Sequence, residues 1–154
     1  MNDISERSQV KSMTDGRKFD WQRMAIIYLR LALGAAFLSG IADRFGLYGK
    51  NVGYGNFAGF LQYTAKVNSF MPASAIPFLA WAATALELTF GVALVIGIWL
   101  RWAALGSSLL LFVFGTAMAI SFGIKSPLDY SVFSASAAAL VLAAHEFRKH
   151  AKAT

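Results

Sequence analysis

The feature that most constrains this chain is an apolar segment from Trp102 to Phe122, which has 21 residues and no charged side chain. A helix needs about 20 apolar residues to cross the hydrocarbon core of a bilayer. Of the 154 residues in the chain, 57% are apolar and 14% are charged. Because this composition leaves too few polar residues for a water-facing surface, the sequence predicts an all-α integral membrane protein.

Three further segments have enough apolar residues to cross the membrane. In chain order, the predicted spans are residues 24–42, 76–98, 102–122 and 127–147. The fourth reaches full length only if it begins at Ser126-Pro127-Leu128-Asp129, which combines a capping box with proline at the first helical position. The four spans predict a four-helix bundle in the membrane.

The spans form one membrane domain, residues 23–147, between a flexible polar tail at 1–22 and a short tail at 148–154. The first span begins too late and runs too long for an ordinary signal peptide. Gly40 and Ala42 do place small residues where a signal peptidase cuts, so cleavage stays open as an alternative to an uncleaved anchor.

Basic residues are unequally distributed between the two sides of this arrangement. Nine Lys and Arg residues lie in the two tails and the second loop, whereas four lie in the first and third loops. Because Lys and Arg are enriched on the cytoplasmic side, both tails are predicted to be cytoplasmic. The expected location is the plasma (inner) membrane. Trp21, Trp99 and Trp102 fall at the cytoplasmic ends of their spans, where indole rings are enriched.

The first loop, residues 43–75, contains a further predicted helix. Asn56 is a suitable N-cap, Pro72 ends the segment, and apolar residues recur between them at helical spacing. Because these residues share one face, the segment from Asn56 to Met71 is predicted to be an amphipathic helix on the outer membrane interface.

Arg30 and Glu87 are ionisable residues inside predicted spans. Charges in hydrocarbon are costly, which makes both residues candidates for function. Gly34 and Gly91 leave room on the same helix faces, and consecutive spans run antiparallel, so a buried ion pair between Arg30 and Glu87 is predicted. Two structural alternatives stay open: the pair only fixes helix register, or Arg30 extends to the inner surface while Glu87 is protonated.

A polar cluster is predicted at the outer mouth of the bundle. The predicted topology places five residues there on one side of the membrane: Asp43, Arg44, Lys125, Asp129 and Tyr130. Such a cluster suits a polar headgroup or an anion. The alternative is that Asp129 is a helix cap and the others are ordinary interface residues.

Some classes of chemistry are excluded by the residues present. The chain has no cysteine, which rules out dithiol exchange, disulfides and thiolate metal sites. His145 and His150 are five positions apart and do not share a helix face, so no metal site is predicted. The basic residues form no nucleic-acid-binding motif, so no nucleic-acid partner is predicted. No catalytic or cofactor-binding residue is identified.

Two blocks of sequence carry a resemblance to a known family. The first span contains LRLALGAAFLSG, and the second and third contain LELTFGVALVIGIWLRWAALG, with Glu87, Gly91, Gly97 and Arg101 in order. In these blocks the chain resembles the DoxX-like family of four-helix membrane proteins over about 28–144, and Arg30 and Glu87 match the family's charged positions. The segments IADRFGLYG and IKSPLDYSVFSASAAA resemble an uncharacterised branch of that family.

The resemblance implies a role beside membrane redox enzymes, because the family includes proteins of redox and sulfur metabolism such as thiosulfate:quinone oxidoreductase subunits. We therefore expect an accessory or scaffold component of a membrane redox system. The alternatives are a quinone-linked oxidoreductase subunit and a small proton-coupled carrier that uses Glu87. Expected partners are membrane lipids, a redox protein and other copies of the chain, and quinone is implied by the resemblance alone.

Overall fold

The computed structural model describes residues 20–49 and 51–152, and these contain helices and no strands. The first 19 residues, within the predicted flexible tail, lie outside the described part. The elements in chain order are α2 (Trp21–Arg44), α3 (Phe57–Val67), the 3-10 helix η1 (Ala73–Ala75), α4 (Ile76–Ile96), α5 (Leu100–Phe122), α6 (Lys125–Asp129) and α7 (Val132–Ala151).

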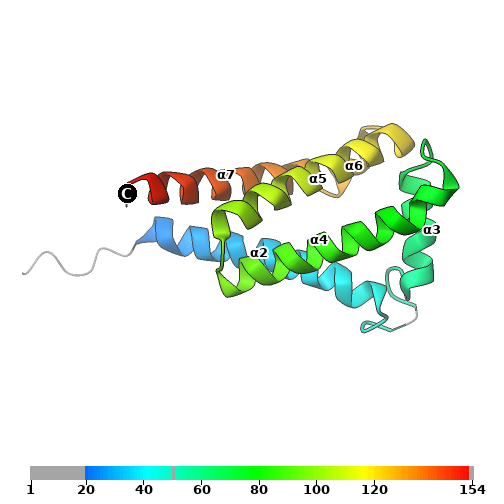
Figure 1. Cartoon of the computed structure of the whole chain (residues 1–154), viewed down its shortest axis with the longest axis horizontal. Coiled ribbons are helices and arrows are strands. Elements are labelled where there is room, and N and C mark those ends of the chain that lie inside the picture. The colour runs from blue at the N-terminus through cyan, green and yellow to red at the C-terminus, as the bar shows by residue number, and fades with distance from the viewer. Residues whose placement is uncertain (1–19, 50, 153–154) are drawn as a thin grey trace, which may run out of the picture.

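The four long helices run lengthwise beside one another. Helix α2 packs against α4 and α7, and α5 packs against the same two helices (Figure 1). Helix α3 lies across one end of this group, where it contacts α2, α4 and α5. We call this end the α3 end. The start of α2 and the end of α7 lie at the opposite end (Figure 1).

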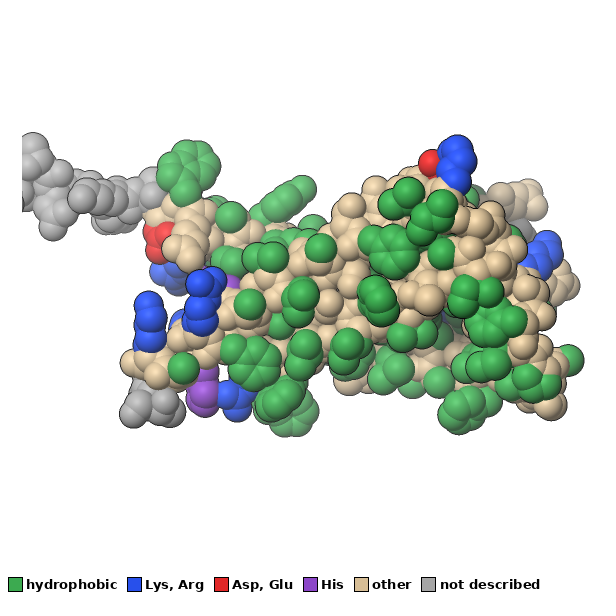
Figure 2. All heavy atoms as spheres, turned by 90° about the horizontal axis from the view of Figure 1, so that it is seen from above, with side chains coloured by type: hydrophobic (Ala, Val, Ile, Leu, Met, Phe, Trp, Pro, Cys, Tyr) green, Lys and Arg blue, Asp and Glu red, His purple; other side chains and the backbone are tan. Residues whose placement is uncertain are grey.

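Within the described part of the chain, three helical segments are long and apolar enough to cross a membrane: α2, the segment Ala73–Ile96 formed by η1 and α4, and α5. Their outer faces carry exposed apolar side chains, including Leu86, Val113 and Ile120. Figure 2 shows hydrophobic side chains along the middle of one face and Lys and Arg side chains towards the ends. An apolar belt between charged ends is what a bilayer requires, so the chain is a membrane protein.

The predicted start of the fourth span is wrong. A short helix, α6, begins at Lys125 and has no side-chain cap, so the capping box is not formed. The helix ends at Asp129, and Ser131 adopts a left-handed conformation (φ 55°) before α7 begins at Val132. The segment from 127 to 147 is therefore two helices. Helix α7 continues to Ala151, through most of the predicted C-terminal tail.

Helix α3 confirms the predicted helix in the first loop. The Asn56 side chain accepts a hydrogen bond from the backbone N–H of Gly59 (2.9 Å), as an N-cap does. The helix ends earlier than predicted, at Val67, because Asn68 caps it through two hydrogen bonds to the Thr64 carbonyl. Its buried face, with Phe60, packs against α4 and α5, so this face covers protein.

Close packing of α2 on α4 depends on glycine. A Cβ atom at Gly34 would lie 2.7 Å from the side chain of Val95 and 3.0 Å from the carbonyl oxygen of Gly91. Small residues on α7 also lie in the core, where Ala139 and Ala143 are buried. Small residues let helix backbones approach closely, and both contacts follow that rule.

Replacing Gly34 with valine should push α2 away from α4. Overpacking of this kind costs about 1–3 kcal/mol, so the purified Gly34→Val protein should unfold at a lower temperature in detergent. Ala36→Val is the matched control, because Ala36 lies on the same helix with its side chain exposed. Equal unfolding temperatures for the two variants would show that the Gly34 contact is not tight.

Candidate functional site

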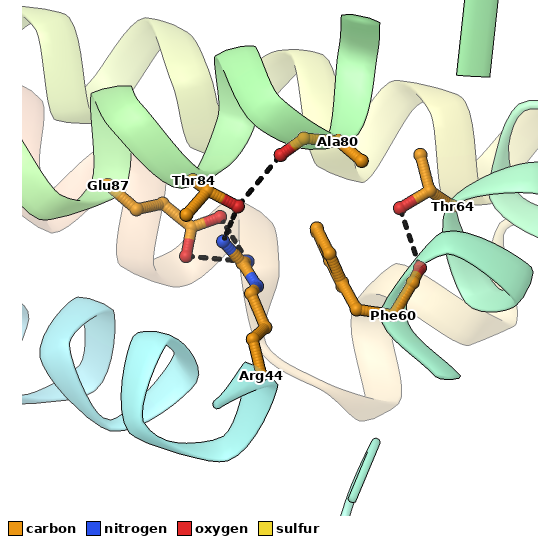
Figure 3. Close-up of polar contacts among 6 residues, drawn as sticks. All are labelled: Arg44, Phe60, Thr64, Ala80, Thr84 and Glu87. Carbon is orange, nitrogen blue, oxygen red and sulfur yellow. Dashed lines mark hydrogen bonds and ion pairs between the residues drawn. The ribbon is translucent and has the colours of Figure 1, made fainter. Parts of the chain in front are cut away.

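Glu87 lies at the middle of α4 and is buried, with 4% of its surface exposed. Both of its carboxylate oxygens accept hydrogen bonds from Nη2 of Arg44, each at 2.7 Å. Arg44 is the last residue of α2 and is equally buried. The two side chains form a salt bridge inside the protein (Figure 3).

Two further residues complete the surroundings of Arg44. Its Nη1 donates a hydrogen bond to Oγ1 of Thr84 (3.1 Å), and Thr84 in turn donates to the carbonyl oxygen of Ala80 (2.8 Å). The Phe60 ring, from α3, lies with its centroid 3.7 Å from Cζ of Arg44 (Figure 3). A cation over an aromatic face at this distance gains a cation–π interaction. Helix α3 thus closes the site.

The register of α2 against α4 explains why these residues meet. Arg30, the tenth residue of α2, lies beside Gly97, just after the end of α4, and Arg44, the last residue of α2, lies beside Thr84. The eight residues of α4 before Thr84 therefore extend beyond α2, and α3 packs on this extension through Phe60, Ala80 and Ala83. Gly40 leaves room for the carboxylate, since a Cβ there would lie 3.3 Å from Oε2 of Glu87.

The predicted ion pair between Arg30 and Glu87 is not formed. Glu87 pairs with Arg44, and Arg30 lies against Gly97, the residue that follows α4. The prediction located the two residues by their depth in the spans, and did not foresee that α2 reaches Arg44 or that α4 extends beyond it. A long arginine side chain at the end of one helix reaches the middle of its neighbour.

The predicted outer-mouth cluster does not form one site. Asp43 and Arg44 are neighbours in sequence, but Arg44 turns into the protein and Asp43 binds the first loop. Lys125 and Asp129 form an exposed salt bridge within α6, and Tyr130 is 74% exposed. Thus only Arg44 of these five residues joins the buried charge at Glu87.

Asp43 fixes the loop that leads into α3. Its carboxylate oxygens accept hydrogen bonds from the backbone N–H of Tyr54 at 3.2 and 3.0 Å. The preceding residue, Gly53, has φ 56°, and a Cβ there would lie 2.2 Å from the Asp43 carboxylate, so only glycine fits. The loop therefore returns to the end of α2, which places α3 over Arg44.

Tyr54 adds an aromatic wall to the site. Its ring centroid lies 5.2 Å from those of both Phe60 and Tyr63. Burial, reinforced by the neighbouring Tyr63, raises the pKa of Tyr54 to about 12, so its phenol stays protonated at physiological pH. Tyr54, Phe60 and Thr84 were not predicted as site residues; the helical spacing of apolar residues in the first loop pointed to Phe60, and no sequence signal pointed to Tyr54 or Thr84.

The chemical capacity of this site is narrow. Each carboxylate oxygen of Glu87 is bound by Arg44, and the Phe60 ring lies against the guanidinium. Among residues 20–49 and 51–152, no group of three or more His, Asp or Glu side chains is arranged to hold a metal. The site joins three helices, α2, α3 and α4, through a charge pair enclosed by protein.

The Arg44–Glu87 pair predicts a non-additive response to mutation. Removing one partner of a buried pair leaves the other unpaired and costs about 3–5 kcal/mol, whereas replacing both with apolar residues is often nearly neutral. Arg44→Leu and Glu87→Leu should each lower abundance and unfolding temperature, and the double variant should recover most of the loss.

Lys125→Gln and Asp129→Asn are the matched controls, because they break the exposed pair on α6. Exposed pairs contribute only about 0–1 kcal/mol, so these variants should unfold close to wild type. If the losses of the two core variants simply add in the double variant, Arg44 and Glu87 do not interact.

Comparison with known families matches residues 25–128 of the chain to the DoxX family model. Comparison with curated proteins and with solved structures gave no match. The matched region includes Arg30, Arg44 and Glu87 and ends at Leu128, before α7 begins. Because the family model covers more than half of the chain, the expected resemblance is confirmed: this chain belongs to the DoxX family.

Proposed function

We propose that the protein is an accessory or scaffold component of a membrane redox system, built as a four-span bundle in the plasma membrane. The observation that carries the scaffold role is the closed Arg44–Glu87 pair. Its hydrogen bonds join α2 to α4, and the Phe60 ring of α3 lies against it. Charges used in this way fix an arrangement of helices and leave the surface free for a partner.

The redox part of the proposal rests on the resemblance to DoxX proteins of redox and sulfur metabolism. The chain has no cysteine, so any electron transfer has to use a carrier or partner that brings its own redox group. This favours a supporting role next to a redox enzyme.

One observation favours a quinone-linked oxidoreductase subunit as the second candidate. Phe45, Phe57 and Trp81 form a row at the α3 end, with ring centroids 6.2 Å and 4.4 Å apart. Phe45 and Trp81 are more than half exposed, and flat aromatic faces are suited to stacking against a quinone ring. A proton-coupled carrier is less favoured, because both oxygens of Glu87 are already bound by Arg44.

The proposed membrane arrangement makes α7 the fourth span. Helix α7 packs along α5, carries the exposed apolar residues Leu140 and Val141, and ends with Arg148 and Lys149. Basic residues in the last turn suit a cytoplasmic terminus. In this arrangement α3 lies at the outer interface, and its face away from the protein meets headgroups.

Reporter fusions test the arrangement directly. Fusions after Tyr54 and Ser126 should report an outer location, whereas fusions at Arg101 and Thr154 should report a cytoplasmic one, because the basic residues are biased in that way. The measurement is the paired activity of a reporter active only outside and one active only inside. A C-terminus outside the cytoplasm would exclude the four-span arrangement.

The scaffold role is tested by identifying the proteins that co-purify with the full chain after the membrane is solubilised. When the tagged full chain is purified in mild detergent, a membrane redox protein with its own flavin, haem or iron–sulfur group should co-purify with it. Quinone should not co-purify in a stoichiometric amount. The same protein should co-purify with the Arg44→Leu/Glu87→Leu variant if the pair is structural. Quinone retained at one per chain and reduced on addition of a reductant would support the oxidoreductase subunit instead, and uptake into vesicles driven by a pH gradient would support the carrier.

A further inference from the structure

A second polar feature lies at the end of the molecule opposite α3. A cavity of about 770 Å³ opens there between the start of α2 and the end of α7, and Leu100 at the start of α5 contributes to its lining. The Gln22 and His145 side chains lie 3.4 Å apart and connect the two walls. None of the residues of the Arg44–Glu87 site lines this cavity.

The cavity exists because α2 is longer at this end than α4 and α5. Helix α4 ends at Ile96, and the next residue, Gly97, has φ 90°. Arg30 lies beside this glycine, since a Cβ on Gly97 would be 2.8 Å from Nη1 of Arg30. The nine residues of α2 before Arg30 extend past this turn by about 14 Å, at 1.5 Å per residue. Arg30 thus lies at the inner end of the cavity.

The charge of the cavity is strongly positive. Five cationic side chains line it, Arg23, Arg30, Arg148, Lys149 and Lys152, against two carboxylates, Asp20 and Glu146. Asp20 is already used as the N-cap of α2, where it accepts from the backbone N–H of Arg23 (3.0 Å). The Nε atom of Arg30 is buried and has no hydrogen-bond partner within the described residues. The cavity therefore has a surplus of cations and an unused buried donor.

The position of the cavity indicates where an anion would come from. The turn beside Arg30 carries exposed Ile98 and Trp99, and Trp102 follows one turn later. Tryptophans in such a position mark the boundary between hydrocarbon and headgroups. Arginine presents several N–H donors in a planar fork that matches phosphate oxygens, and basic pockets between membrane helices bind anionic headgroups.

We propose that this cavity binds the phosphate of an anionic phospholipid, with Arg30 as the inner ligand and Arg148 and Lys149 at the rim. The lipid chains then lie along the apolar surfaces of α2 and α7. This site is independent of the proposed redox role. Arg30 has no carboxylate partner in the part of the chain described here. In this proposal the lipid phosphate is its partner.

Native mass spectrometry of the detergent-solubilised full chain tests the proposal. The probes are phosphatidylglycerol and phosphatidylcholine with identical acyl chains, and inorganic phosphate is added as a competitor. The wild-type protein should bind phosphatidylglycerol more tightly than phosphatidylcholine. Each cation removed near a headgroup is worth about 1 kcal/mol, so Arg30→Gln should bind about fivefold more weakly and Arg148→Gln/Lys149→Gln more weakly still.

The matched control is Lys66→Gln/Lys125→Gln, which removes two exposed cations from the α3 end and should leave lipid binding unchanged. If Arg30→Gln does not fold, the exposed Arg148 and Lys149 pair decides the question. Equal binding of the two lipids, or equal loss in the control and the cavity variants, would overturn the proposal. Displacement of phosphatidylglycerol by an equal concentration of inorganic phosphate would assign the cavity to a soluble anion and overturn the lipid assignment.

Discussion

The salt bridge between Arg44 and Glu87 is the interaction on which the α3 end of the molecule depends. A carboxylate in the middle of an apolar helix is costly unless it is paired, and the end of α2 supplies the cation. The buried guanidinium needs a cover, which Phe60 provides. That cover stays in place because Asp43, next to Arg44, holds the loop at Tyr54. These contacts hold Tyr54 and Phe60 of the first loop close to the buried charge.

The two arginines of α2 have opposite environments. Arg44 is enclosed, and Glu87 and Thr84 use two of its nitrogens. Arg30 faces an open cavity with other cations, beside the turn that follows α4. The molecule therefore has a closed, locally neutral end and an open, positive end, joined by apolar helices. This difference between the two ends suits a membrane component that binds lipid at its positive end and presents a fixed surface at its neutral end.

Sequence patterns predicted most of the fold but less of the site. Long apolar segments located α2, α4 and α5, and helical spacing with Asn56 located α3. The partner of Glu87 was missed, because the register of two apolar helices is set by contacts such as Gly34 with Val95, which no local pattern specifies. The break at Ser131 was missed for a related reason: a serine rarely adopts positive φ, and nothing nearby signals it.

The order of Arg44 and Glu87 along the chain has a consequence for how the chain enters the membrane. Arg44 is synthesised first, and Glu87 follows 43 positions later, after the loop and α3. A lone carboxylate at the centre of a bilayer costs about 2.5–3.5 kcal/mol during insertion. Insertion of α4 beside α2 as a helical hairpin avoids this cost, because Arg44 is then next to Glu87. Because α2 precedes α4 in the chain, Arg44 is available before Glu87 enters the membrane.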